Sequence, residues 1–229
     1  MRHIPNIITS MNLLSGFAAL IFILAGSPDT ACILIAAAMV FDFLDGMASR
    51  LLNAYSDIGK ELDSLADMVS FGVVPGLLIY TLLAGKTDGE VNFFYLAVSA
   101  LFPVCAALRL AKFNTDSEQS VSFKGLPTPA GALAVISLVM ASAFSDNEIV
   151  KNFAESNTAV AIFNIIISLL MVSRFPMLSL KIKNMNFRGN EARYILVLVC
   201  IIQITLFGFS GLPLIIPAYI AVSVAWSLF

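Results

Sequence analysis

The stretch FDFLDGMASRLLNAYSDIGKELDSLADMVS, at residues 41–70, carries five aspartates in a chain that is 59% hydrophobic. Four of the five lie in or beside apolar segments long enough for a lipid bilayer: Asp42, Asp45, Asp63 and Asp67. An ionised carboxylate inside a membrane is costly unless it meets a cation, so these four are candidates for a functional site. The fifth, Asp57, is expected to be a loop residue or a helix cap.

The rest of the chain agrees with a membrane setting. It has 229 residues, a mean hydropathy of +0.92, a net charge of −2 and only 12% charged residues, where soluble domains carry about 25%. Apolar runs of about 18 residues or more recur throughout, which predicts an all-α polytopic membrane protein. We expect about eight transmembrane helices, at 6–25, 31–51, 65–84, 92–111, 128–145, 158–175, 194–209 and 212–228.

The basic residues predict the orientation, because lysine and arginine accumulate in cytoplasmic loops. With eight spans and the N-terminus inside, only Lys86 and Lys151 of the 13 basic residues lie outside. The other eleven lie on the cytoplasmic side: Arg2, Arg50, Lys60, Arg109, Lys112, Lys124, Arg174, Lys181, Lys183, Arg188 and Arg193. We therefore expect both termini and the aspartates at the cytoplasmic face.

Two other readings of the sequence are disfavoured. A cleaved signal peptide at the N-terminus would need a small-residue cleavage site, which the first apolar segment lacks. The three cysteines, Cys32, Cys105 and Cys200, all fall in apolar spans, and their spacing fits neither a metal site nor a disulfide framework.

The four aspartates form two pairs with helical spacing. Asp42 and Asp45 are three residues apart, and Asp63 and Asp67 are four apart, so each pair shares one helix face. The two helices are consecutive and must pack antiparallel, which brings four mutually repelling carboxylates to one pocket. Oxygen ligands alone suit Mg²⁺ or Mn²⁺, and two such ions about 4 Å apart are typical of phosphoryl-transfer sites.

Nearby residues fit a phosphate ligand. Gly46 follows the first pair, and Gly59 precedes the second, where glycine allows close approach to the backbone. Arg50 lies one turn beyond Gly46 and can bind a phosphate through paired hydrogen bonds. Taken singly, Gly46 is more often a helix-packing glycine and Arg50 a membrane anchor.

The spacing of these residues resembles the signature of the CDP-alcohol phosphotransferases, D-x2-D-G-x2-A-R-x8-G-x3-D-x3-D. Seven of its eight fixed positions match, and the departure is Ser49 in place of alanine. The resemblance implies that Asp42, Asp45 and Asp63 bind two metal ions, and that Asp67 touches the second ion and acts as general base. It also implies that the cytidine diphosphate donor is held by Gly46, Arg50, Gly59, Asn12 and Thr9.

Further stretches resemble one branch of that family, the small bacterial phosphatidylserine synthases. They include IPNIITSMNLLSG at 4–16, LRLAKFN at 108–114 and FKGLPTPAGA at 123–132. The resemblance implies a six-helix domain over 1–185, with an additional hairpin over 186–229, in the bacterial inner membrane. It also implies transfer of a phosphatidyl group from CDP-diacylglycerol to L-serine, and a homodimer, with no nucleic-acid partner.

The acceptor site is the least defined part of the sequence. L-Serine brings a carboxylate that needs a fixed cation, and Arg109 and Lys112 lie three apart at the end of the fourth span, with Lys124 as the next candidate. Positive-inside anchoring explains the pair equally well. GLPTPAG at 125–131 is either a rigid loop over the site or the start of the fifth span.

Three alternatives remain open. A relative with another acceptor, such as glycerol 3-phosphate or an inositol phosphate, would favour a denser basic pocket. An intramembrane prenyltransferase also uses carboxylate-bound Mg²⁺, but its two acidic motifs are far apart in the chain. A metal-ion transporter would need acids near the bilayer midplane with access from both sides.

Overall fold

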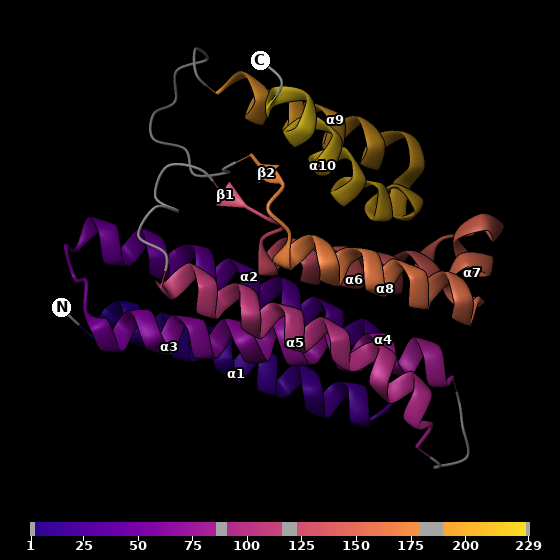
Figure 1. The fold of residues 1–229 in the computed structure, drawn as a ribbon, viewed down its shortest axis with the longest axis horizontal. Helices are drawn as coiled ribbons and strands as arrows, with labels where there is room; N and C mark the ends of the chain where they lie inside the picture. Colours follow the sequence, from indigo (N-terminus) through magenta and orange to yellow (C-terminus); the bar gives the residue numbers. More distant parts are fainter. Residues whose placement is uncertain (1–2, 86–90, 116–122, 179–189, 228–229) are drawn as a thin grey trace.

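The computed structural model describes residues 3–85, 91–115, 123–178 and 190–227. Nearly all of these residues are helical (Figure 1). The helices are α1 (Ile4–Leu24), α2 (Pro28–Leu51), α3 (Asp57–Asp67), α4 (Val74–Ala84), α5 (Phe93–Thr115), α6 (Thr128–Phe144), α7 (Glu148–Glu155), α8 (Asn157–Val172), α9 (Glu191–Phe207) and α10 (Ile215–Ser227). A π-helix, η1 (Met68–Val73), joins α3 to α4, and a 3-10 helix, η3 (Gly208–Leu214), joins α9 to α10.

The chain is an all-α, multi-pass membrane protein, as the hydropathy pattern predicts. Five helical stretches are long and apolar enough to cross a bilayer: 4–24, 28–51, 57–84, 93–115 and 191–226. A sixth forms if α6 and α7, which are bent by 120°, count as one span, and α8 is a shorter apolar helix. All eight predicted spans thus coincide with helices, although fewer stretches meet the criteria of length and composition.

Some elements differ from the sequence expectation. Residues 52–61 were expected to be a connector, but α3 begins at Asp57, because Ser56 caps it by accepting a hydrogen bond from the Gly59 amide at 3.0 Å. The polar connector after the fifth span contains helix α7. Two short strands also form, β1 (Phe123–Lys124) and β2 (Pro176–Met177), and they pair antiparallel.

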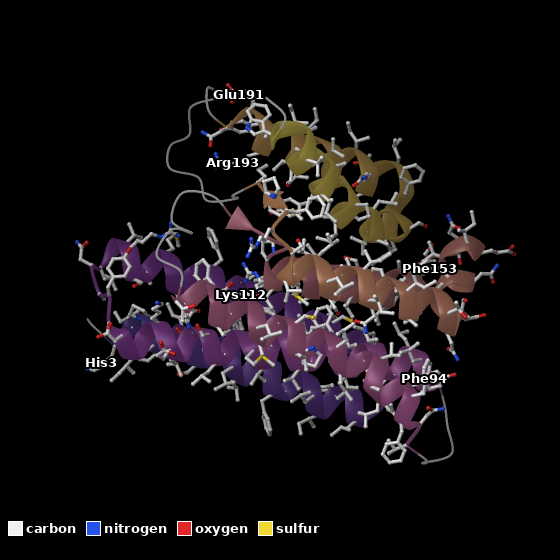
Figure 2. All side chains as sticks on the ribbon, viewed as in Figure 1. His3, Phe94, Lys112, Phe153, Glu191 and Arg193 are labelled. Carbon is white, nitrogen blue, oxygen red and sulfur yellow. The ribbon has the colours of Figure 1, made fainter. Side chains whose placement is uncertain are left out.

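The helical stretches α1, α2, α3–α4 and α5 alternate in direction along the bundle. Figure 1 shows α1, α2, α3–α4 and α5 packed together, with α6 and α8 beside them and the α9–α10 hairpin outermost. His3 lies at the end of the bundle where α2 meets α3, whereas Phe94 and Phe153 lie at the opposite end (Figure 2).

Buried polar contacts join helices within the bundle. Asn164 of α8 is fully buried, and its Nδ2 donates a hydrogen bond of 2.6 Å to the carbonyl of Val98 in α5. The Ser168 hydroxyl donates to the Asn164 Oδ1 at 3.2 Å. In an apolar environment such groups must be paired, so Asn164 fixes α8 against α5 at a defined register.

The π-helix follows from a proline. Pro75 has no amide hydrogen, so the carbonyl of Phe71 lacks its usual helical donor. The chain instead forms wider turns, in which the Val74 amide donates to the Val69 carbonyl, five residues back. Because η1 begins directly after Asp67, this irregular turn sets the course of the helix beside the aspartates.

Candidate functional site

The aspartates of α2 and α3 converge, as the sequence predicts. One carboxylate oxygen from each of Asp42, Asp63 and Asp67 lies within 4.8 Å of the others. Asp45 stands outside this group of three, but it is buried and close enough to Asp42 and Asp63 for their charges to repel. At 1.5 Å per residue, the four lie about 9–15 Å inside the ends of α2 and α3 that meet.

The donor atoms fit a divalent metal ion. The Oδ2 of Asp45 and the Oδ1 of Asp63 are buried and have no hydrogen-bond partner among the described residues. A buried carboxylate oxygen without a partner is costly, and neighbouring carboxylates add repulsion. Hard oxygen-binding cations offset both effects. The group of three carboxylates can therefore hold a metal ion, with Asp45 at its edge.

Helix α1 closes one side of this cluster. Asn12 is fully buried, and its Nδ2 donates a hydrogen bond of 3.2 Å to the Oδ1 of Asp67. Its own Oδ1 has no partner among the described residues. Thr9, one turn earlier, is buried beside Asp45, and its hydroxyl donates to the Pro5 carbonyl at 3.0 Å. The two α1 residues predicted for donor binding, Thr9 and Asn12, thus lie at the cluster.

A close helix contact holds α1 in this position. The Ser70 hydroxyl of η1 donates a hydrogen bond of 3.0 Å to the Asn12 carbonyl. A Cβ atom added at Gly16 would stand 2.3 Å from the Ser70 Oγ and 2.9 Å from its Cα. Glycine is therefore needed at position 16, because any side chain would push α1 away from η1 and would move Asn12 away from Asp67.

The remaining motif residues lie near the mouth of the site. A Cβ at Gly46 would have open space, with only Arg50 Nη2 at 4.0 Å, so this face of α2 is free for a ligand. Arg50 is exposed, and its Nε donates to the Gly46 carbonyl at 2.8 Å. Gly59 has a packing reason of its own, since a Cβ there would lie 2.9 Å from Ser56 Oγ and 3.0 Å from Asn6 Oδ1.

The candidate acceptor cations separate in the structure. Arg109 of α5 is half-buried and close enough to Asp67 and Asp42 for electrostatic interaction. Its Nη1 donates a hydrogen bond of 2.6 Å to the Thr128 hydroxyl, while its buried Nε has no partner among the described residues. Lys112 is exposed (Figure 2). Lys124 lies in β1, and its side chain is outside the part of the chain that the structure describes.

Sequence reasoning missed several polar contacts around the site. Thr128 belongs to the GLPTPAG stretch, which could have marked it as a candidate site residue. Its hydrogen bond with Arg109 can be recognised only in the folded structure. The Lys60 Nζ donates to the Asn114 carbonyl at 3.0 Å, and the Asn114 Nδ2 donates to the Ser64 hydroxyl at 2.8 Å. These bonds tie α3 to the end of α5, one turn from Asp63.

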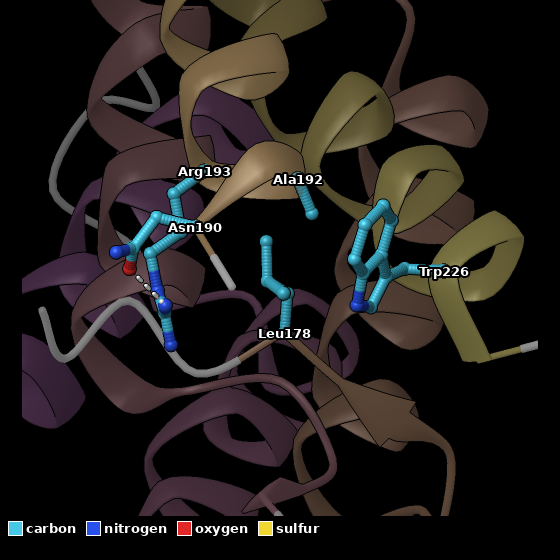
Figure 3. Close-up of a pocket in the computed structure, with 5 residues that line it drawn as sticks. All are labelled: Leu178, Asn190, Ala192, Arg193 and Trp226. Carbon is cyan, nitrogen blue, oxygen red and sulfur yellow. Dashed lines mark hydrogen bonds between the residues drawn. The ribbon is translucent and has the colours of Figure 1, made fainter. Parts of the chain in front are cut away.

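Two cavities among the described residues lie away from the aspartates. One of about 70 Å³ sits at the C-terminal hairpin (Figure 3), lined by Leu178, Asn190, Ala192, Arg193 and Trp226. The other, of about 660 Å³, lies at the opposite end of the bundle between α4, α6, α7 and α8. The first is smaller than the roughly 300 Å³ usual for ligand sites, and neither contains a carboxylate of the cluster.

The arrangement suits chemistry on a phosphate. Convergent carboxylates can hold cations that neutralise a phosphate group, and a carboxylate among them can accept a proton from an attacking hydroxyl. Arg109, which lies near enough to Asp67 and Asp42 for electrostatic interaction, supplies a positive charge for an anionic substrate.

Comparison with known proteins places this geometry in context. The family described as CDP-alcohol phosphatidyltransferase matches residues 2–172. A CDP-diacylglycerol–serine O-phosphatidyltransferase of Helicobacter pylori strain J99 is 36% identical over 199 residues, which cover 85% of this chain and 78% of that protein.

Proteins of two other organisms are also similar to this chain. The CDP-diacylglycerol–serine O-phosphatidyltransferase of Bacillus subtilis is 37% identical over 138 residues, 60% of this chain and 76% of its own. An archaetidylserine synthase of Methanothermobacter thermautotrophicus is 32% identical over 174 residues, 74% of this chain and 67% of its own. The family match includes all four aspartates and ends before α9 and α10.

Proposed function

The chain belongs to the CDP-alcohol phosphatidyltransferase family, and we propose that it transfers the phosphatidyl group of CDP-diacylglycerol to L-serine, giving phosphatidylserine and CMP. The observation that carries the proposal is the convergence of Asp42, Asp63 and Asp67 within 4.8 Å, with Arg109 near enough to interact electrostatically with Asp42 and Asp67. The relatives from Helicobacter pylori and Bacillus subtilis are serine O-phosphatidyltransferases, which supports serine as the acceptor.

Two divalent ions, Mg²⁺ or Mn²⁺, are proposed to be held by Asp42, Asp45, Asp63 and Asp67. The partnerless buried oxygens of Asp45 and Asp63 support this assignment. When bound, such ions would stabilise the negative charge of the diphosphate and of the departing CMP.

Asp67 is the proposed general base. It accepts the proton of the serine hydroxyl, whose oxygen then forms a bond to the phosphorus that carries diacylglycerol. The bond from that phosphorus to the bridging oxygen breaks, and CMP leaves with the electron pair. The hydrogen bond from Asn12 to the Asp67 Oδ1 supports this role, because it holds one oxygen in place. Most of the rate enhancement comes from positioning and electrostatics.

The donor is proposed to lie against α1, α2 and the start of α3. Gly46, Arg50, Gly59, Asn12 and Thr9 hold the cytidine diphosphate, while its acyl chains stay in the bilayer. The open face at Gly46 and the exposed Arg50 guanidinium support this placement.

The serine carboxylate is proposed to bind Arg109, with Lys112 and Lys124 as weaker candidates. The buried Nε of Arg109 is a donor that needs an acceptor, and burial strengthens a charge-assisted hydrogen bond. Lys112 is exposed to solvent and therefore less suited to hold a desolvated carboxylate.

The protein is proposed to lie in the bacterial cytoplasmic membrane as a homodimer, with both termini and the active site facing the cytoplasm. Support for the orientation comes from the described basic residues. Arg50 lies at the end of α2 and Lys60 at the start of α3, where these helices meet, and Arg109 and Lys112 lie in the last turns of α5. Lys151 lies in α7, at the other end of the bundle (Figure 1). Light scattering of the detergent-solubilised protein measures the number of copies.

An acceptor panel tests the proposed function. Purified protein and CDP-diacylglycerol are incubated with labelled L-serine, glycerol 3-phosphate or an inositol phosphate, with Mg²⁺, with Mn²⁺ or with EDTA. Of the three acceptors, we expect only serine to give a labelled lipid, and only when a divalent metal is present. Faster transfer to a phosphorylated alcohol would reassign the acceptor, and full turnover in EDTA would contradict the metal site.

A further inference from the structure

The C-terminal hairpin holds one residue of the preceding segment by both of its backbone polar groups. Tyr219 of α10 is 3% exposed, and its hydroxyl donates a hydrogen bond of 2.9 Å to the Leu178 carbonyl. The Ser223 hydroxyl accepts a bond of 3.1 Å from the Leu178 amide and donates one of 2.7 Å to the Tyr219 carbonyl. The backbone at Leu178 is thus fixed to α10.

Leu178 directly follows β2, which pairs with β1. Met177 lies opposite Phe123 and Pro176 opposite Lys124. The pairing continues beyond the strands, because the Gly125 amide donates to the Phe175 carbonyl at 2.8 Å and the Leu126 amide to the Leu170 carbonyl at 2.9 Å. Because α10 fixes the backbone at Leu178, it also fixes β2, and through β2 it fixes β1 and the residues that lead into α6.

That segment ends at the partner of Arg109. Thr128, the first residue of α6, is fully buried, and its hydroxyl accepts the hydrogen bond from the Arg109 Nη1. Tyr219 also lies near enough to Arg109 for the two groups to interact electrostatically. The hairpin is thus connected to the Arg109 guanidinium by a series of contacts that runs through Leu178, β2, β1 and Thr128. Tyr219 itself also lies close to the guanidinium.

We propose that Tyr219 is a positioning residue for the acceptor, holding Arg109 in the geometry that binds the acceptor's carboxylate. This inference rests on the proposed function, and it assigns a role to α10, which lies outside the family match. An arginine side chain has many rotamers, so a guanidinium that is fixed before binding loses less entropy when the carboxylate arrives.

Tyr219→Phe tests the proposal, because it removes the hydroxyl and keeps the ring. The apparent KM for serine should rise by about 2- to 12-fold, the effect of one neutral hydrogen bond. The KM for CDP-diacylglycerol and the kcat should stay within about 2-fold, given that the donor is held elsewhere. Ser223→Ala, which loosens the other contact to Leu178, should shift the serine KM in the same direction.

Tyr95→Phe is the matched control. The Tyr95 hydroxyl accepts a hydrogen bond of 2.8 Å from Asn157 at the opposite end of the bundle, so this variant removes a hydrogen-bonded tyrosine hydroxyl far from the site. Both kinetic constants should match the wild type. Thermal unfolding of every variant in detergent separates lost positioning from lost folding.

A double-mutant cycle gives the decisive outcome. In an Arg109→Ala background, Tyr219→Phe should produce no further change in the serine KM, because residues that act in one path are not additive. An unchanged serine KM in both Tyr219→Phe and Ser223→Ala, or a full additional effect in the Arg109→Ala background, overturns the proposal. Absence of serine transfer by the wild type overturns the proposed function instead, and the same variants are then measured with the acceptor that is used.

Discussion

At the scale of single residues, Asp67 has the most constrained environment of the four carboxylates. It is buried between α1 and α2, it accepts a hydrogen bond from Asn12, and it faces both Arg109 and the other aspartates. The amide of Asn12 holds one of its oxygens, and the positive charge of Arg109 lies near enough to interact with it. This environment suits a base that must meet a hydroxyl at a defined angle.

Asp63→Asn should abolish transfer while leaving the protein folded. The change keeps the shape of the side chain but removes one charge from the cluster, and metal sites are sensitive even to residues beyond the ligands, at about 10–100-fold each. We expect a loss of at least about 100-fold in the serine transfer assay. Asp57→Asn, the same change on an exposed residue of α3, is the control and should keep its activity.

Arg109→Ala and Lys112→Ala should differ, although the sequence places both on one helix face. Losing a charge-assisted hydrogen bond of about 1.5–3 kcal/mol weakens serine binding by about 10- to 150-fold. We expect this rise in serine KM for Arg109→Ala, and less than about 3-fold for the exposed Lys112→Ala. The KM for CDP-diacylglycerol, measured separately, should stay unchanged in both. A wild-type serine KM in Arg109→Ala would direct the search to Lys124 and Asn12.

At the scale of helices, buried polar side chains determine how the spans pack. Asn164→Ala removes the side chain that joins α8 to the Val98 carbonyl, and it leaves that carbonyl and Ser168 with one partner fewer. The free energy of unfolding should fall by about 1–3 kcal/mol, seen as a lower unfolding temperature in detergent. Asn157→Ala, at the exposed start of α8, should change it little. Equal shifts in the two variants would show that burial is not the cause.

The sequence predicts spans well because an apolar run of sufficient length has few alternatives in a bilayer. It also predicts the meeting of the two aspartate pairs, since helical spacing and a short connection determine it. It does not predict the pairing of Arg109 with Thr128 or the contact of Tyr219 with Leu178, because both depend on the route of the chain through β1 and β2. Helix α7 was missed because four of its eight residues are polar and the segment is too short to look like a span.

At the scale of the whole molecule, the two ends of the bundle differ in charge. Cysteines placed at Asn152 in α7 and at Asp57 in α3, in a protein without its three native cysteines, test the orientation. An impermeant reagent should label Asn152→Cys in intact cells, and Asp57→Cys only after lysis. The reverse pattern would put the carboxylates on the side away from cytosolic serine. Five basic residues that the sequence assigns to a side of the membrane lie outside the described residues: Arg2, Lys86, Lys181, Lys183 and Arg188.

The depth of the carboxylates has a consequence for how rate depends on lipid. They lie about 9–15 Å inside the helix ends, within reach of a headgroup whose acyl chains never leave the hydrocarbon. If the donor arrives by lateral diffusion, the rate at which the enzyme meets it depends on the mole fraction of the donor in the membrane. Diluting CDP-diacylglycerol with inert lipid at constant bulk concentration should therefore slow the reaction. The dependence of the rate on serine should follow the concentration of serine in water.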